Sequence, residues 1–249
     1  MKKETFLAFV GFFLLSLTTV VYAVEEKAKT VTISEQKADI TGDTELETIL
    51  LKGVPYQEEE DFLKEIFIEI KASNGKKYTF PLESGAKASF QLVDLNHDGV
   101  RDVLATVQTG GSGGIVLSFL HSLKNFVHTD LTVPDPVEME SRFVNDYKAE
   151  IKIKETGKTY PFDLKDRKLY YKKLGLYYKG KLNEPTELMV NSYSSLKPVE
   201  LGEGKLGLKG VQRIAGIANA DTICFVESTW RYLNGKWNLL EVKVKKEAN

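Results

Sequence analysis

The chain has 249 residues, with 34 basic and 35 acidic side chains and a formal net charge of −1. This balance gives no electrostatic reason to expect a nucleic-acid partner or attraction to an anionic membrane surface. The apolar content of 42% is enough for a packed core, and the length suits one large or two small domains.

The N-terminal 23 residues have the pattern of a secretory signal. Lys2 and Lys3 precede an apolar run over residues 6–21, and Val21 and Ala23 occupy the −3 and −1 positions of a cleavage site. We predict a signal helix over residues 1–23 that is removed after Ala23. The alternative is a retained membrane anchor. Cleavage would leave no stable membrane span and places the mature chain outside the cytoplasm, either secreted or in the cell envelope.

The rest of the chain reads as an all-β protein. Residues 24–34 form a polar lead-in, and residues 35–249 are predicted to be a single β-repeat domain. Asn74-Gly75 and Asn234-Gly235 are flanked by alternating apolar residues, which predicts antiparallel hairpins with tight turns that need positive φ. Residues 57–65 could form one short helical turn. Cys224, the only cysteine, is predicted to be a buried apolar residue.

The sequence DLNHDGVRD concentrates oxygen-bearing side chains. Asp94, Asn96, Asp98 and Asp102 occupy positions 1, 3, 5 and 9 of this loop, and Gly99 occupies position 6. Three carboxylates this close repel one another unless a cation holds them. Ca²⁺ takes six to eight oxygen ligands in flexible geometry, whereas Mg²⁺ demands a rigid octahedron. The loop therefore predicts a calcium site.

The geometry of such a loop suggests the individual ligands. The first three oxygen-bearing side chains would point inward, the backbone carbonyl of Val100 would come next, and Asp102 would close the site. An EF-hand is the obvious competitor, but it needs a glutamate at position 12 and a following helix. Position 12 is Ala105, and the segment after it is β-branched and glycine-rich, which favours a strand.

The same spacing recurs upstream. Asp39, Thr41, Asp43 and Glu47 repeat the 1, 3, 5, 9 pattern, whereas residues 200–207 keep the glycines and have lost most of the oxygens. The starts of these loops indicate a period near 53 residues, the size of a four-stranded propeller blade. About four such repeats fit, which predicts antiparallel propeller-like blades in an incomplete or small propeller.

Together, DLNHDGVRD entering a strand, ADITGD and QRIAGIANADT resemble FG-GAP/VCBS repeats, the blades of integrin-like propellers, and in particular short secreted VCBS-repeat proteins of Gram-positive bacteria. The resemblance implies structural calcium held by Asp94, Asn96, Asp98, Val100 and Asp102. It implies a second, weaker set in Asp39, Thr41, Asp43 and Glu47. Thr44 stands where the motif has glycine, which weakens that second set.

No catalytic set is visible. The three histidines have no ligand spacing, and no GxSxG elbow marks a serine nucleophile. His121 and His128 are expected to be partly exposed strand residues, and residues 110–114 a hairpin connection. Arg213 and Asp221 could form a structural ion pair or part of a binding surface. No cofactor other than Ca²⁺ is expected.

The segment LYYKKLGLYYKGK, residues 169–181, alternates tyrosines and lysines. It could offer stacking faces and charge to a polysaccharide or polyanion, or it could be a solvated strand with aromatic residues packed on one side.

These observations predict a secreted or cell-envelope calcium-binding β-repeat protein that is not an enzyme and that binds an unknown protein or polysaccharide at the cell surface. The alternative is an extracellular hydrolase, or a module associated with one, acting on cell-wall or polysaccharide material. Converging carboxylates in a cleft would favour that alternative. A third possibility is an envelope component that assembles with its own kind.

Overall fold

The structure is a computed structural model that describes residues 29–57 and 61–246. Its elements are seventeen strands, two 3-10 helices and one short α-helix. The prediction of a mostly antiparallel β protein is confirmed, since every strand pair in the described residues is antiparallel. The predicted signal helix over residues 1–23 lies outside the described residues.

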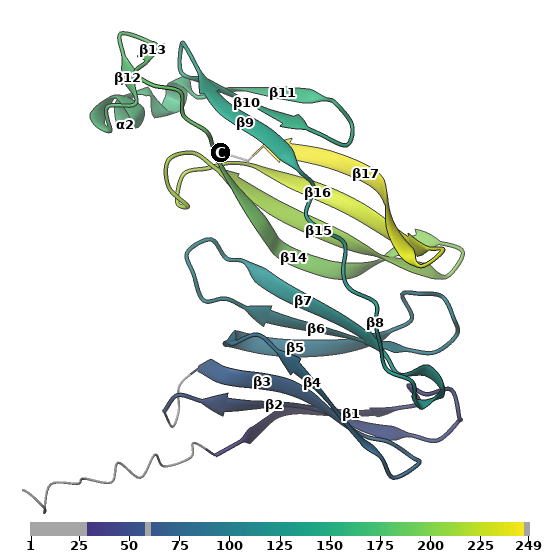
Figure 1. The fold of residues 1–249 in the computed structure, drawn as a ribbon. Helices are drawn as coiled ribbons and strands as arrows, with labels where there is room; N and C mark the ends of the chain where they lie inside the picture. The colour runs from purple at the N-terminus through teal and green to yellow at the C-terminus, as the bar shows by residue number, and fades with distance from the viewer. Residues whose placement is uncertain (1–28, 58–60, 247–249) are drawn as a thin grey trace, which may run out of the picture.

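The N-terminal half forms one eight-stranded sheet in the order β1-β2-β3-β5-β6-β7-β8, with β4 paired to β3 (Figure 1). Its strands are β1 (Val31–Ala38), β2 (Glu47–Pro55), β3 (Phe62–Lys71), β4 (Lys77–Leu82), β5 (Gly85–Val93), β6 (Asp102–Gln108), β7 (Val116–Ser122) and β8 (Thr129–Asp130). The 3-10 helix η1 (Lys124–Phe126) precedes β8. Only Phe62 and Leu63 of β3 pair with β5, so the sheet is divided there into two four-stranded units.

The C-terminal half has three smaller sheets. The first contains β9 (Met139–Val144), β10 (Lys148–Ile153) and β11 (Thr159–Asp163), and η2 (Lys165–Arg167) and α2 (Lys168–Lys173) follow it. The strands β12 (Tyr177–Tyr178) and β13 (Lys181–Leu182) form a small hairpin. The last sheet is a meander of β14 (Met189–Gly202), β15 (Lys205–Ala215), β16 (Thr222–Leu233) and β17 (Lys236–Lys246).

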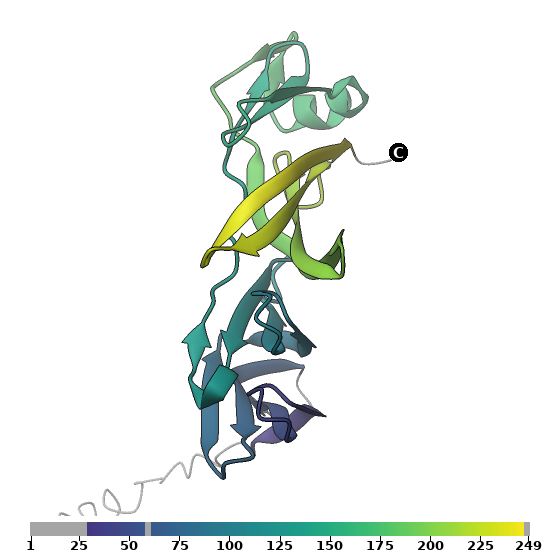
Figure 2. The same ribbon diagram turned by 90° about the vertical axis from the view of Figure 1, so that its right-hand side faces the viewer.

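The first strands of the four units begin at Val31, Gly85, Met139 and Met189, at intervals close to the 53 residues expected from the sequence. The propeller-like arrangement of these units is not confirmed. Strands β1–β8 form one continuous sheet, and Figures 1 and 2 show the sheets stacked in an elongated column rather than around a ring. The β3–β5 pairing joins the first two units into one sheet, whereas the blades of a propeller are separate sheets around a channel.

Two hydrophobic cores flank strands β5–β7. Val103, Ala105 and Val107 of β6 face the core shared with β1–β4, whereas Leu104 and Leu120 belong to the core shared with β9–β17. Successive residues of a strand point to opposite faces, so a strand that is apolar at every position can serve both cores. Strand β6 therefore packs into both cores, whereas Lys87, Ser89 and Gln91 of β5 are exposed.

Both predicted hairpins form, but only one of them has the predicted tight turn. Asn234 and Gly235 both have positive φ and join paired residues 233 and 236, as a primed turn requires. At Asn74-Gly75 only the glycine has positive φ, and the hairpin has a longer connection between β3 and β4. Part of the helical turn predicted for residues 57–65, residues 58–60, lies outside the described residues, and the prediction is wrong from Phe62 onward, because β3 begins there. Strand β1 begins at Val31, inside the predicted lead-in.

Candidate metal-binding loops

The loop between β1 and β2 holds the upstream acidic set. Ile40 is buried and fixes the loop to the core, and its backbone N–H donates to the Glu47 carboxylate at 3.0 Å. The Asp39 carboxylate accepts hydrogen bonds from the backbone of Gly42 at 2.6 Å and of Thr44 at 2.9 Å. A carboxylate has about four lone-pair sites, so these bonds orient it without filling it.

Three carboxylates converge in this loop. Asp39, Asp43 and Glu47 each offer an oxygen, and these oxygens lie within 4.8 Å of one another. Within residues 29–57 and 61–246 no other group of three acidic, histidine or cysteine side chains is gathered this closely. Glu47 is fully buried, and its second oxygen accepts the backbone N–H of Ser73 from the β3–β4 turn at 3.2 Å.

Two hydroxyl groups, those of Ser73 and Thr41, lie beside the three carboxylates. The Ser73 hydroxyl donates to Asp43 at 2.6 Å, and this hydrogen bond is the main reason that the pKa of Asp43 lies below its usual value. Thr41 is 1% exposed, and its hydroxyl lowers the same pKa but lies outside hydrogen-bond geometry from any protein atom. A buried hydroxyl without a partner costs free energy, so this oxygen is available to an ion.

The loop between β5 and β6 repeats the same framework. Asp94 accepts the backbone N–H of Gly99 at 3.0 Å, as Asp39 accepts that of Thr44. Asp102 accepts the backbone N–H of Leu95 at 3.0 Å, as Glu47 accepts that of Ile40. The repeated spacing in the sequence therefore corresponds to a repeated loop conformation.

The downstream loop differs in how its charge is balanced. Lys124 donates to the backbone carbonyl of Asp98 at 2.7 Å, and its amine lies 3.6 Å from the Asp98 carboxylate. Asn96 donates its side-chain amide to the same carboxylate at 3.0 Å. Asp102 is fully buried with one oxygen unpartnered, and burial raises its pKa to about 6 against the hydrogen bonds that it accepts.

The two loops lie next to each other, at the ends of the strands that they connect. A Cβ at Gly42 would lie 3.0 Å from the Val100 side chain. The η1 segment contacts both loops, because Asn125 donates its backbone N–H to the Thr41 carbonyl at 2.8 Å and Lys124 contacts Asp98. The spacing of residues within each loop could not predict that Ser73 and Lys124 contact these loops, because both residues come from other segments of the chain.

The sequence ranked residues 94–102 first as the calcium loop. The structure gathers carboxylates in the other loop, at Asp39, Asp43 and Glu47. Asp94, Asp98 and Asp102 do not form a comparable cluster, and a lysine amine lies beside Asp98. The assignment of Asn96 and Val100 as ligands stays a prediction.

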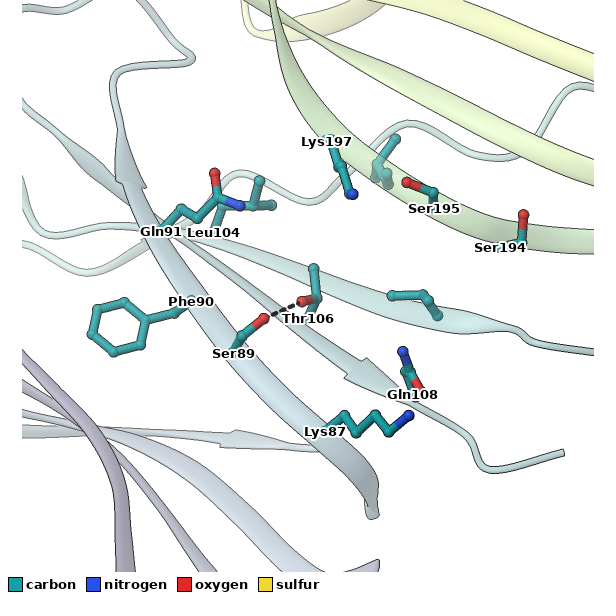
Figure 3. A pocket seen from close by; sticks show the side chains of 12 residues that line it. Lys87, Ser89, Phe90, Gln91, Leu104, Thr106, Gln108, Ser194, Ser195 and Lys197 are labelled. Atoms are coloured by element: carbon teal, nitrogen blue, oxygen red, sulfur yellow. Dashed lines mark hydrogen bonds between the residues drawn. The ribbon is translucent and has the colours of Figure 1, made fainter. Parts of the chain in front are cut away.

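A groove lies between β5–β6 and β14 (Figure 3), with a volume of about 260 Å³. Ser89 and Thr106 face it and share a hydrogen bond of 3.0 Å, and Lys197 points toward it from β14. Ligand sites usually have volumes of about 300–1,000 Å³. This groove is therefore large enough only for a small polar molecule.

The prediction for Cys224 is confirmed, whereas the ion pair suggested for Arg213 and Asp221 does not form. Cys224 is buried as predicted, and burial raises the pKa of its thiol to about 12. Asp221 pairs with Arg167 at 2.7 Å, while Arg213 donates to the Ser112 carbonyl, so Arg213 and Asp221 are not partners.

The histidine prediction is wrong for His121. It is 7% exposed, lies 3.2 Å from the His128 ring nitrogen and packs against Phe80. Burial lowers the pKa of His121. The cross-strand neighbours that bury it are distant in sequence, so alternation along β7 gave no sign of them.

Comparison with known proteins gives one family and one relative. Residues 137–245 match the family model of the YybI C-terminal domain. The chain is 27% identical over 214 residues to the "Uncharacterized protein YybI" of Bacillus subtilis (strain 168), which covers 83% of this chain and 79% of that protein. No solved structure matches the chain.

The resemblance to FG-GAP/VCBS repeats is therefore wrong. The family match is to the YybI C-terminal domain, and it includes neither acidic loop. The physical reason is that an Asp/Asn/Gly loop between two antiparallel strands is a local solution, since its carboxylates accept the loop's own backbone N–H groups. Such a loop can arise without the rest of a propeller blade.

Proposed function

We propose that the chain is a calcium-binding β protein of the extracytoplasmic space, secreted or held in the cell envelope, in which the ion braces a loop and takes part in no catalysis. The observation that carries this proposal is the convergence of Asp39, Asp43 and Glu47, with their oxygens within 4.8 Å. The buried, unpartnered Thr41 hydroxyl adds a fourth oxygen to the same loop. All of these donors are oxygens, which Ca²⁺ prefers.

The extracytoplasmic location rests on the pattern of residues 1–23. None of the helices in the described residues has the length and hydropathy that a membrane crossing needs. The partner is proposed to be a protein or polysaccharide at the cell surface. The hydrolase alternative has less support, since the two glutamates that line one described surface hollow, Glu140 and Glu150, are each ion-paired, to Lys152 and Arg142.

Extracellular calcium sites commonly have Kd values of about 10⁻⁴–10⁻³ M. With calcium about tenfold above Kd, the free energy of unfolding would rise by about 1.4 kcal/mol. For a chain of this size the melting temperature would rise by roughly 3–6 °C.

The test is a calcium titration by calorimetry, together with melting curves in calcium and in chelator. We expect Asp43→Asn to abolish both the binding heat and the thermal shift. Glu45→Gln is the matched control, because Glu45 is exposed in the same loop and lies outside the carboxylate cluster. A wild-type protein that melts identically in calcium and in chelator would refute the proposal. A stoichiometry of two that falls to one in Asp98→Asn would support the 94–102 prediction as well.

A further inference from the structure

The segment around α2 carries a concentrated positive charge. Residues 164–183 contain seven lysines and arginines and only one acidic residue, in a chain whose net charge is −1. The overall balance therefore conceals one strongly basic surface. Such a surface attracts anions locally, whatever the net charge of the protein.

The two tyrosine pairs of this segment each divide between core and surface. Tyr171 and Tyr177 are buried at 0% and 2% exposure, and they anchor the segment through hydrogen bonds to Asp221 and to the Val144 carbonyl. Tyr170 and Tyr178 are 41% and 64% exposed. The buried rings fix the segment to the core, so the exposed rings and the lysines are held in place on the outside.

Tyr178 and four of the lysines line a hollow of about 640 Å³, which we term the basic hollow. It lies between the β9–β10 turn, α2 and the β12–β13 hairpin. Figure 1 shows these elements at the end of the molecule far from β1. Asp146 is the only carboxylate among its lining residues. The other side chains that line it are Lys165, Lys168, Lys172, Lys179, Tyr147 and Tyr178.

Two lysines of the basic hollow place their amines over tyrosine rings. The Lys168 amine lies 5.5 Å from the centre of the Tyr147 ring, and the Lys179 amine lies 5.3 Å from that of Tyr178. Lys168 and Lys172 are four residues apart on α2, which places them on one face of the helix. Lys165 also pairs with the exposed Asp163 at 3.1 Å.

We propose that the basic hollow binds an anionic, phosphate-bearing polyol or saccharide polymer. Lysine amines are point charges that suit phosphate oxygens, and exposed tyrosine faces pack against the apolar faces of polyol or sugar units. A flexible polymer chain can enter a hollow lined by four lysines, whereas a flat bilayer would contact only its rim. This site is distant from the acidic loops, so the inference does not depend on calcium binding.

The experiment uses the full mature chain and a fluorescent glycerol-phosphate oligomer, titrated at several salt concentrations with and without calcium. We expect the affinity to fall as salt rises, with a slope of log K against log salt of roughly −2 to −3, because three or four lysines displace counterions. Lys168→Gln with Lys172→Gln should weaken binding at least about tenfold and reduce the slope by about two. Tyr178→Leu should weaken binding with the slope unchanged.

The matched control is Lys64→Gln with Lys236→Gln, which removes two exposed lysines from distant strands. Equal losses in the control and in the Lys168/Lys172 variant would overturn the proposal, since binding would then follow net charge alone. Preference for phosphatidylglycerol vesicles or for a single-stranded oligonucleotide over the glycerol-phosphate oligomer would also overturn it. Loss of calcium binding in Asp43→Asn with polymer binding intact would show that the two sites are separate, and polymer binding that is unaffected by chelator supports the proposal.

Discussion

Asp221 links the α2 segment to the last sheet, and its removal should be costly. One carboxylate oxygen accepts a hydrogen bond from Arg167 at 2.7 Å, and the other accepts one from the Tyr171 hydroxyl at 2.7 Å. The Asp221 side chain is 7% exposed, that of Arg167 is 20% exposed and Tyr171 is fully buried. Asn at this position would remove the charge and turn an amide N–H₂ toward one of the two donors.

Breaking a buried ion pair by changing one partner costs about 3–5 kcal/mol. Because Arg167 keeps some contact with water, we expect Asp221→Asn to lower the free energy of unfolding by about 3 kcal/mol. Tyr171→Phe removes only one hydrogen bond to a charged group, which contributes about 1.5–3 kcal/mol. The Tyr171 ring would still fill its place in the core.

The measurement is urea unfolding of both single variants and of the double variant. The three groups form one network, so the loss in the double variant should be smaller than the sum of the single losses by about 1 kcal/mol or more. Asp166→Asn is the control, because Asp166 is 55% exposed and lies 3.6 Å from Arg167, and it should cost less than about 0.5 kcal/mol. An additive double variant, or a loss below about 1 kcal/mol for Asp221→Asn, would refute this reasoning.

Three further predictions concern other parts of the fold. Burial lowers the pKa of His121, so the unfolded chain binds a proton there more readily. Stability should fall as the pH drops below the ordinary histidine value of about 6.5, by at most about 1.4 kcal/mol per pH unit. Urea unfolding across pH should show a flatter profile in His121→Gln, and an unchanged profile would contradict this assignment. Gly210→Ala should cost about 1–3 kcal/mol, because its Cβ would lie 2.2 Å from the buried Tyr193 ring. Gly111→Ala is the control, since its Cβ would come no closer than 4.0 Å to another side chain, and equal losses would exclude the steric explanation. Ile151→Ala in β10 should cost about 2–5 kcal/mol by leaving a cavity in a fully buried site, and a melting temperature unchanged from wild type would contradict this.

The sequence predicted those features that depend on neighbouring residues. Asn234-Gly235 forms the expected primed turn because its φ values are set locally. The spacing of oxygens in residues 39–47 and 94–102 likewise corresponds to a shared loop conformation, because the carboxylates bond to backbone groups within each loop. Alternation of apolar residues was enough to indicate antiparallel strands.

The features that the sequence did not predict depend on distant contacts. Ser73 reaches Asp43 from another turn, and Lys124 reaches Asp98 from η1. The sequence ranked residues 94–102 above residues 39–47 as a calcium loop, and it did not predict that the carboxylates converge in residues 39–47. The burial of His121 depends in the same way on Phe80 of β4. The division of the Tyr170/Tyr171 pair was not predicted either, because these residues lie in α2 rather than in a strand. Tyr177 and Tyr178 do lie in a strand, β12, and they face opposite sides.

Strand β6 packs into both hydrophobic cores, and this limits where the chain can be cut. Leu104 and Leu120 belong to the same core as Ile151 and Ile214, so a fragment that starts at residue 137 would lose part of its own interior. The complementary N-terminal fragment would present these leucines to water. The region defined by the family match thus lacks residues of the core that it shares with β6 and β7. Expression of either half alone should give aggregation, and the two halves are expected to persist only when synthesised as one polypeptide.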